Sequence, residues 1–218
     1  LLRTLVLSLA ASVSPAQLAF VLVDFKGGAT FDGLAGLPHV AGVVTDLEPR
    51  LAARVLRSLR AEVTRREHLL RTLGHPDLPS AREATGTPVA PRLAIVVDEF
   101  AALAIEHPHL LHSLVDVARR GRSLGVHLVL ATQRPAGVVS EEIRTNTDLR
   151  IALRLHEAAE AMEVVGDPSP SAIRRDAAGR AVMRLGPGEL LPFQTARPAD
   201  ARTMVEEIRQ AAAALGIG

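Results

Sequence analysis

The sequence contains no cysteine, tryptophan or tyrosine, which leaves phenylalanine as its only large aromatic residue. The absence of cysteine excludes a disulfide scaffold, a thiolate metal site and a cysteine nucleophile. Lysine is almost absent too, because Lys26 is the only lysine among 25 basic residues. With 24 acidic residues the formal net charge is +1, which excludes the strong overall basic charge expected of a small DNA-binding domain.

Long apolar segments are also missing. The apolar runs, such as the one ending at Val97, are far shorter than the ~18 residues of a membrane-spanning helix, and no signal peptide is visible. A mean hydropathy of +0.20 with mixed charge excludes a disordered acidic or basic chain. The 218 residues suit a single domain over 1–218, large enough to bury roughly 70% of the surface of the unfolded chain.

Short apolar runs alternate with amphipathic segments, a pattern typical of an α/β fold with a mostly parallel sheet flanked by helices. The runs predict strands over 18–23, 40–45, 93–97, 126–131 and 151–155, and a C-terminal β-hairpin over 181–185 and 190–194. The periodic segments predict helices over 1–13, 46–73, 108–124 and 199–215. Four prolines and two glycines predict a flexible loop over 74–91.

The long helix predicted over 46–73 is amphipathic. Asp46 is expected to cap its N-terminus. Its core-facing residues recur at i, i+4 spacing and are Leu51, Val55, Leu59 and Val63.

An acidic pair, Asp98 and Glu99, directly follows the apolar run over 93–97. A buried strand that ends in such a pair matches the Walker B pattern of phosphoryl-transfer proteins. In this interpretation Asp98 holds Mg²⁺, directly or through water, and Glu99 polarises the attacking water as a general base. The alternative is structural, because the helix dipole also favours acidic residues at the start of a helix.

Thr132 and Gln133 follow the run over 126–131, and Pro135 comes two residues later. The carboxyl ends of parallel strands meet at one edge of a sheet, where ligands bind, so we expect Asp24, Asp98 and Thr132 to converge there. The amide of Gln133 both donates and accepts hydrogen bonds, as a sensor of the γ-phosphate requires. The alternative is an ordinary turn closed by Pro135.

Three segments, in this order and at this spacing, resemble the FtsK/SpoIIIE family of P-loop motor ATPases. They are Val97–Phe100, Ala118–His127 and Ala131–Pro135, and 146–152 is similar to the family's next strand. The resemblance extends from Leu1 to about Arg197. It implies a RecA-like (ASCE) P-loop ATPase core that uses ATP and Mg²⁺, with Asp98 as magnesium ligand, Thr132 as nucleotide-binding residue, and Glu99 and Gln133 as catalytic residues.

The resemblance also implies a missing part. In this family a Gly-rich loop ending in Gly-Lys-Ser or Gly-Lys-Thr precedes a helix like 1–13, but no G-x-x-x-x-G-K-[ST] occurs in this sequence. The chain starts at Leu1 without a capping residue. We therefore expect a single ATPase domain over 1–218 that lacks its N-terminal phosphate-binding loop and is inactive by itself.

Two further basic residues gain roles from the resemblance. The segment Val23–Ala29 with Phe31 is similar to the version found in EccC/EssC-type motors of type VII secretion, and it places Lys26 beside the nucleotide. There Lys26 contacts phosphate, or it pairs with Asp24 or Glu99. Arg57 is the candidate arginine finger for a neighbouring subunit; the alternative is a solvated helix face with pairs such as Glu62 and Arg66.

The resemblance implies a motor that assembles into a ring, expected to be a hexamer, and powers type VII protein secretion. Its partners would be a secreted helical protein and other components of the secretion machine, and it would be the cytoplasmic domain of a membrane-anchored bacterial protein. An FtsK-like translocase of double-stranded DNA is the alternative. A third interpretation, from another class, is a module that binds nucleotide or docks substrate without hydrolysis.

Overall fold

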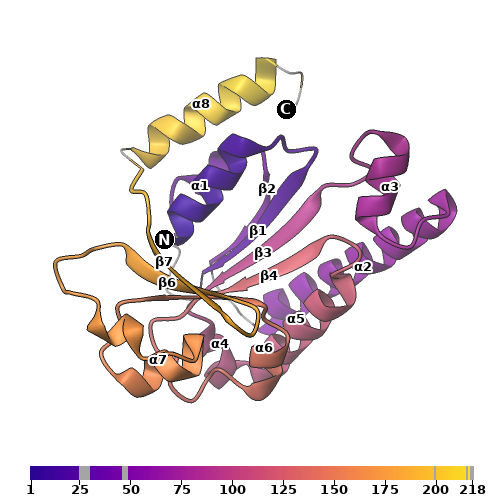
Figure 1. Ribbon diagram of the computed structural model, residues 1–218. Coiled ribbons are helices and arrows are strands. Elements are labelled where there is room, and N and C mark those ends of the chain that lie inside the picture. Colours follow the sequence, from indigo (N-terminus) through magenta and orange to yellow (C-terminus); the bar gives the residue numbers. More distant parts are fainter. Residues whose placement is uncertain (25–29, 46–48, 199, 215, 217–218) are drawn as a thin grey trace. The chain divides into compact units, whose positions relative to one another are not determined.

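The apolar runs between residues 18 and 131 form one parallel sheet, shown in the computed structural model in Figure 1. The sheet order is β2 (Val40–Val44), β1 (Leu18–Asp24), β3 (Arg92–Asp98) and β4 (Val126–Leu130). The structure describes residues 1–24, 30–45, 49–198, 200–214 and 216. Lys26 and the predicted cap Asp46 therefore lie outside the described residues.

The chain divides into two compact units. The parallel-sheet unit comprises Leu2–Thr132 and Asp200–Gly218, and the second unit comprises Gln133–Ala199 with Leu1. Among the described residues, no helix combines the length and the apolar character needed to cross a membrane.

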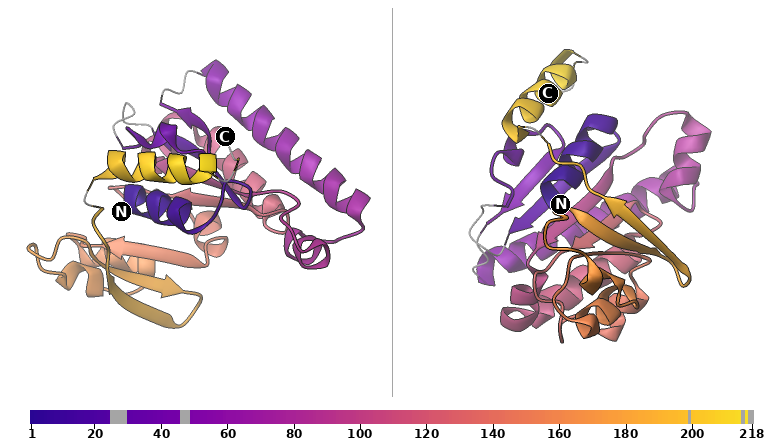
Figure 2. Two further views of the ribbon diagram at one scale, coloured as in Figure 1. Left: turned by 90° about the horizontal axis from the view of Figure 1, so that it is seen from above. Right: turned by 60° about the vertical axis from the view of Figure 1, so that its left-hand side comes forward.

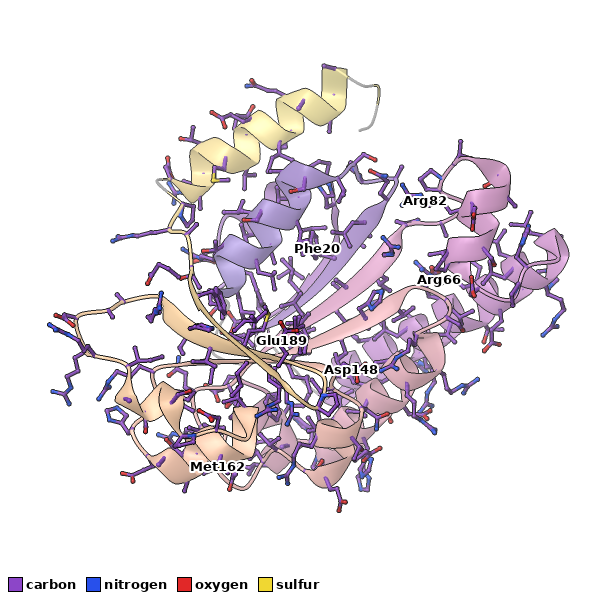
Figure 3. All side chains as sticks on the ribbon, in the orientation of Figure 1. Phe20, Arg66, Arg82, Asp148, Met162 and Glu189 are labelled. Carbon is purple, nitrogen blue, oxygen red and sulfur yellow. The ribbon has the colours of Figure 1, made fainter. Side chains whose placement is uncertain are left out.

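Helices cover both faces of the parallel sheet, which is why its central strands are apolar on both sides (Figures 1 and 2). On one face α1 (Leu2–Ser12) packs over β1 and β3, and α8 (Ala201–Ala214) packs on α1. Phe20 of β1 is fully buried in this layer (Figure 3). A short 3-10 turn, η1 (Leu34–Gly36), lies against α8 and β2.

On the other face α2 (Pro49–Leu73) packs against α5 (Pro108–Gly121), and α5 packs on β4. The predicted core stripe of α2 is confirmed at Leu59 and Val63, which are buried, and Val55 is half-buried. The side chain of Leu51 lies outside the described part of the chain. The helix α4 (Phe100–Glu106), between β3 and α5, was not predicted.

The prediction of a flexible loop over 74–91 is wrong for its centre, which forms helix α3 (Leu78–Thr85). Asp77 caps this helix by accepting a 2.8 Å hydrogen bond from the backbone N–H of Ser80. Pro79 lies in the first turn, where a missing N–H costs nothing. Gly86 ends the helix in the left-handed conformation. Proline and glycine therefore mark the ends of a helix here rather than a loop.

The second unit holds a separate antiparallel sheet, ordered β5 (Leu149–Leu153), β6 (Arg180–Leu185) and β7 (Glu189–Gln194). Its helices are α6 (Glu141–Thr145) and α7 (Ala158–Val165), with a 3-10 turn η2 (Ser169–Ala172). The predicted hairpin is confirmed. The strand predicted over 151–155 begins two residues earlier and pairs with β6, so it does not extend the parallel sheet.

Candidate functional site

The two central parallel strands end in aspartates that lie side by side. Asp24 at the end of β1 and Asp98 at the end of β3 are partners in the strand register. Asp24 is almost completely buried and Asp98 is half-buried. The predicted convergence of acidic residues at this sheet edge is therefore present in the fold.

Thr30 joins the two aspartates. Its hydroxyl donates a 2.6 Å hydrogen bond to Oδ2 of Asp98, and its backbone N–H donates a 2.9 Å bond to Oδ2 of Asp24. Oδ1 of Asp98 lies 3.0 Å from the backbone N–H of Glu99. Hydrogen bonds to a carboxylate fix its orientation, so the carboxylate of Asp98 is held at a defined position.

Glu99 follows with an unusual backbone. Its φ of 54° and ψ of 52° are left-handed, and it is the only non-glycine residue with positive φ in the part of the chain described. Such a conformation costs on the order of 1–3 kcal/mol and persists only where the surroundings impose it. Here Phe100 N–H donates to the carbonyl of Ala131 at 2.8 Å, which ties the residue after Glu99 to the end of β4.

The side chain of Glu99 is nearly buried, with 5% exposed, and Oε1 accepts a 2.6 Å hydrogen bond from the hydroxyl of Thr132. Glu99 occupies the N-cap position of α4, yet its carboxylate makes no capping hydrogen bond to that helix. The structural alternative, an acidic residue that serves the helix N-terminus, therefore does not account for this contact. The carboxylate is instead directed to the end of the neighbouring strand.

Sequence reasoning missed Thr30 and did not predict the hydrogen bond from Thr132 to Glu99. The assignment of Thr132 to the nucleotide stays a prediction. Thr30 lies six residues from Asp24 and 68 from Asp98, so no local pattern marks it. The only sequence signal for Thr30 was its position. It lies one residue before Phe31, which belongs to the segment that resembles EccC/EssC-type motors.

These residues suit a magnesium–phosphate site. Mg²⁺ is held by oxygen ligands and usually binds through one or two carboxylates together with water and substrate phosphates. Asp98 supplies such a carboxylate next to Asp24, and no group of three or more histidine or acidic side chains that could cage a metal occurs in the described ranges. When bound, Mg²⁺ neutralises charge that develops on the phosphates. Glu99 is the remaining carboxylate at this edge and the candidate general base.

The other predicted site residues lie in different parts of the chain. Gln133 begins the second unit, directly after Thr132. Arg57 is exposed on α2, a helix whose buried positions include Leu59 and Val63. Lys26 lies in the stretch that the structure does not describe. The assignments of Gln133, Arg57 and Lys26 remain predictions.

The basic and glycine-rich segment over 118–127 has a structural role. Arg66 of α2 is 2% exposed; it donates to Oε1 of Glu62 and to the carbonyl of Leu124, at 2.7 and 2.8 Å (Figure 3). The predicted Glu62–Arg66 pair is confirmed, but Arg66 is not solvated as expected, because it is buried. A Cβ on Gly121 would lie 2.6 Å from Cβ of Val126. Arg66 thus joins α2 to the turn between α5 and β4, and Gly121 allows α5 to approach β4 closely.

Comparisons with known proteins identify relatives of the chain. Residues 1–137 match the model of the FtsK/SpoIIIE family. The chain is 42% identical over 203 residues to the ESX-4 secretion system protein EccC4 of Mycobacterium tuberculosis, and 36% identical over 204 residues to the type VII secretion system protein EssC of Staphylococcus aureus. Each match covers 90% of this chain but only 16% and 14% of the relatives, so the chain spans about a sixth of their length.

Solved structures of a type VII secretion ATPase also match the chain. The cytoplasmic domain of the type VII secretion ATPase EccC of Thermomonospora curvata matches with a TM-score of 0.85 and 37% identity, over 95% of this chain and 26% of that one. ATPases 2 and 3 of the same protein, in complex with a signal sequence peptide, match with a TM-score of 0.81 and 29% identity, over 96% of this chain and 40% of theirs.

Proposed function

Because the chain belongs to the FtsK/SpoIIIE family, we propose that it is an ATP-hydrolysing motor module that powers type VII protein secretion as part of a ring. The observation that carries the proposal is the ordered set of carboxylates at one sheet edge. Asp98 is oriented by Thr30, and Glu99 is held in a left-handed turn by the end of β4. Each carboxylate is held by contacts with neighbouring residues of the protein, as electrostatic preorganisation requires.

The cofactors of this module are ATP and Mg²⁺. Asp98 holds the metal, Glu99 accepts the proton of the attacking water, and Gln133 orients that water and senses the γ-phosphate. No G-x-x-x-x-G-K-[ST] motif occurs within residues 1–218, so this chain by itself lacks the backbone N–H groups that cradle phosphates. We expect it to bind ATP weakly on its own.

The test of hydrolysis is the substitution Glu99→Gln in the intact protein. Removal of the general base is expected to lower ATP turnover by about 10²- to 10⁴-fold while nucleotide binding persists. Glu106→Gln, an exposed residue at the end of the same helix, is the matched control and should leave turnover unchanged. Unchanged turnover in Glu99→Gln would show instead that this module docks substrate or nucleotide without hydrolysis.

Arg57 is proposed as the arginine finger, acting on the ATP of a neighbouring subunit. An arginine supplied in trans stabilises the transition-state charge by about 10³-fold or more. Mixing intact Arg57→Ala and Glu99→Gln proteins should restore part of the turnover that each lacks, because some interfaces then combine Glu99 of one subunit with Arg57 of the next. Arg54→Ala, another exposed arginine of α2, is the control. Failure of the mixture to recover activity would remove Arg57 from this role.

The proposed cargo is a secreted helical protein, supported by the signal sequence peptide bound to the Thermomonospora curvata relative. In the cell we expect a membrane-anchored bacterial protein whose cytoplasmic part contains this module. A purified helical substrate with its signal sequence should stimulate ATP turnover of the intact protein, whereas double-stranded DNA should not. Stimulation by DNA that falls steeply with salt would favour a DNA translocase instead.

A further inference from the structure

Two arginines lie directly opposite each other in the antiparallel sheet of the second unit. Arg150 on β5 and Arg184 on β6 are partners in the strand register, so both side chains project from one face. Like charges at directly opposed positions destabilise a sheet. Arg144 of α6 adds a third positive charge. Burial lowers the pKa of the Arg150 guanidinium, and the charges of Arg184 and Arg144 lower it further.

The hydrogen bonds of these arginines do not compensate their charge. Arg184 donates to the carbonyls of Val165, Gly166 and Pro187, which carry no formal charge. Asp167 is the acidic residue near Arg184, whose charge helps to lower the pKa of the Asp167 carboxylate, but Asp167 does not line the pocket beside Arg150. The Nε of Arg150 is buried and has no hydrogen-bond partner. Neither Arg144 nor Arg150 forms an ion pair with a described residue. Partial burial of the Arg150 guanidinium without a counter-charge costs free energy. A ligand that supplies the missing negative charge would therefore bind favourably.

An open surface pocket lies beside these arginines, within the second unit alone, and its lining residues other than Arg150 are exposed. Its volume is about 390 Å³, and its lining residues are Glu141, Arg144, Thr145 and Arg150. The Thr145 hydroxyl donates to the carbonyl of Glu141 at 2.9 Å. The Glu141 carboxylate is exposed and forms no ion pair with a described residue. One carboxylate against two guanidinium groups leaves the lining with a net positive charge.

We propose that this pocket binds an oxyanion, a phosphate or a carboxylate group, between Arg144 and Arg150. Such a ligand accepts charge-assisted hydrogen bonds from planar guanidinium groups. It also supplies the negative charge that offsets the repulsion between Arg150 and Arg184. The site consists only of residues from the second unit and is separate in sequence from the carboxylates of β1 and β3.

The test is calorimetric titration of the intact protein with sodium pyrophosphate and, separately, sodium succinate. Chloride keeps the ionic strength constant, and a saturating non-hydrolysable ATP analogue occupies the nucleotide site. One of the two anions should bind, and Arg150→Gln or Arg144→Gln should weaken that binding about tenfold, the effect of losing one charge-assisted hydrogen bond. Preference for pyrophosphate identifies a phosphate ligand, and preference for succinate identifies a carboxylate.

Arg180→Gln is the matched control, because Arg180 is exposed on β6 of the same sheet and does not line the pocket. Arg180→Gln should change the affinity for the anion by less than about twofold, because salt screens a charge that does not contact the ligand. Without added anion, Arg150→Gln should unfold at the same or a higher temperature, because it removes like-charge repulsion. Absence of binding by either anion, or an equal loss of affinity in Arg180→Gln, would overturn the proposal.

Discussion

The hydroxyl of Thr132 donates a 2.6 Å hydrogen bond to Oε1 of Glu99. Thr132, which lies just before the second unit begins at Gln133, therefore holds the candidate general base. Both ends of this contact are constrained. Glu99 sits in a left-handed turn, and Ala131, just before Thr132, accepts a hydrogen bond from Phe100 N–H at 2.8 Å. The geometry of the base therefore depends on the end of β4.

Thr132→Val in the intact protein should lower kcat for ATP by about tenfold or more with little change in KM. Valine keeps the shape but removes the donor, and a hydrogen bond to a charged group contributes about 1.5–3 kcal/mol. Thr132→Ser retains the hydroxyl and should keep most of the activity. Steady-state kinetics of the two variants checks this. Equal activity of the valine and serine variants would show that the hydroxyl does not position Glu99.

Thr30→Val should raise the Mg²⁺ concentration needed for half-maximal ATP turnover. The substitution removes the 2.6 Å hydrogen bond that orients Asp98 but keeps the backbone N–H that contacts Asp24. Loss of a partner that orients a metal ligand typically weakens metal affinity by about 10- to 100-fold. A Mg²⁺ titration of turnover measures the shift, with Thr30→Ser as the variant that should restore it. A Mg²⁺ requirement identical to that of the wild type would contradict the prediction.

Glu62→Gln should reduce stability at neutral pH by about 1–3 kcal/mol, because it leaves buried Arg66 without a charged partner. The hydrogen bond from Arg65, and then the one from Arg66, holds the pKa of Glu62 below its usual value of 4.5. A carboxylate with a lowered folded-state pKa stabilises the fold above pH 4.5, and that contribution is lost as the pH falls through the folded-state pKa. Urea unfolding at several pH values measures both effects.

The stability loss of Glu62→Gln relative to the wild type should therefore shrink at pH values below the folded-state pKa of Glu62. Asp116→Asn breaks an exposed pair with Arg119 and is the control, expected to cost less than ~1 kcal/mol. If the difference in the free energy of unfolding between wild type and Glu62→Gln does not change with pH, the charge of Glu62 is not what stabilises the fold.

Gly121→Ala should destabilise the protein by about 1–3 kcal/mol. The added Cβ would lie 2.6 Å from Cβ of Val126, so α5 and β4 would have to separate. Gly42→Ala in β2 is the control, because a Cβ there meets nothing within 4 Å. Thermal unfolding compares the two. If Gly121→Ala melts at a temperature no lower than Gly42→Ala does, then α5 and β4 accommodate the added methyl group and the prediction is wrong.

The sequence predicted the elements with strong periodicity and missed those whose start and stop signals resemble a loop. β1 and β3 were predicted well because burial on both faces makes each a continuous apolar run. β4 was predicted too, although its run contains the exposed His127. Helix α3 was missed because it is short and has a proline in its first turn, and proline also marks loops. The separate pairing of β5 was missed because a short apolar strand does not reveal which neighbour it joins.

For the candidate site, the sequence alone determined the acidic pair Asp98–Glu99 and the polar end of β4, since both follow directly from where an apolar run stops. Only the tertiary structure decided that Thr30 orients Asp98, that Thr132 holds Glu99 and that Arg66 is buried. The first two contacts join residues 68 and 33 positions apart. Strand register and the paths of the intervening segments bring such residues together, and neither is encoded in local periodicity.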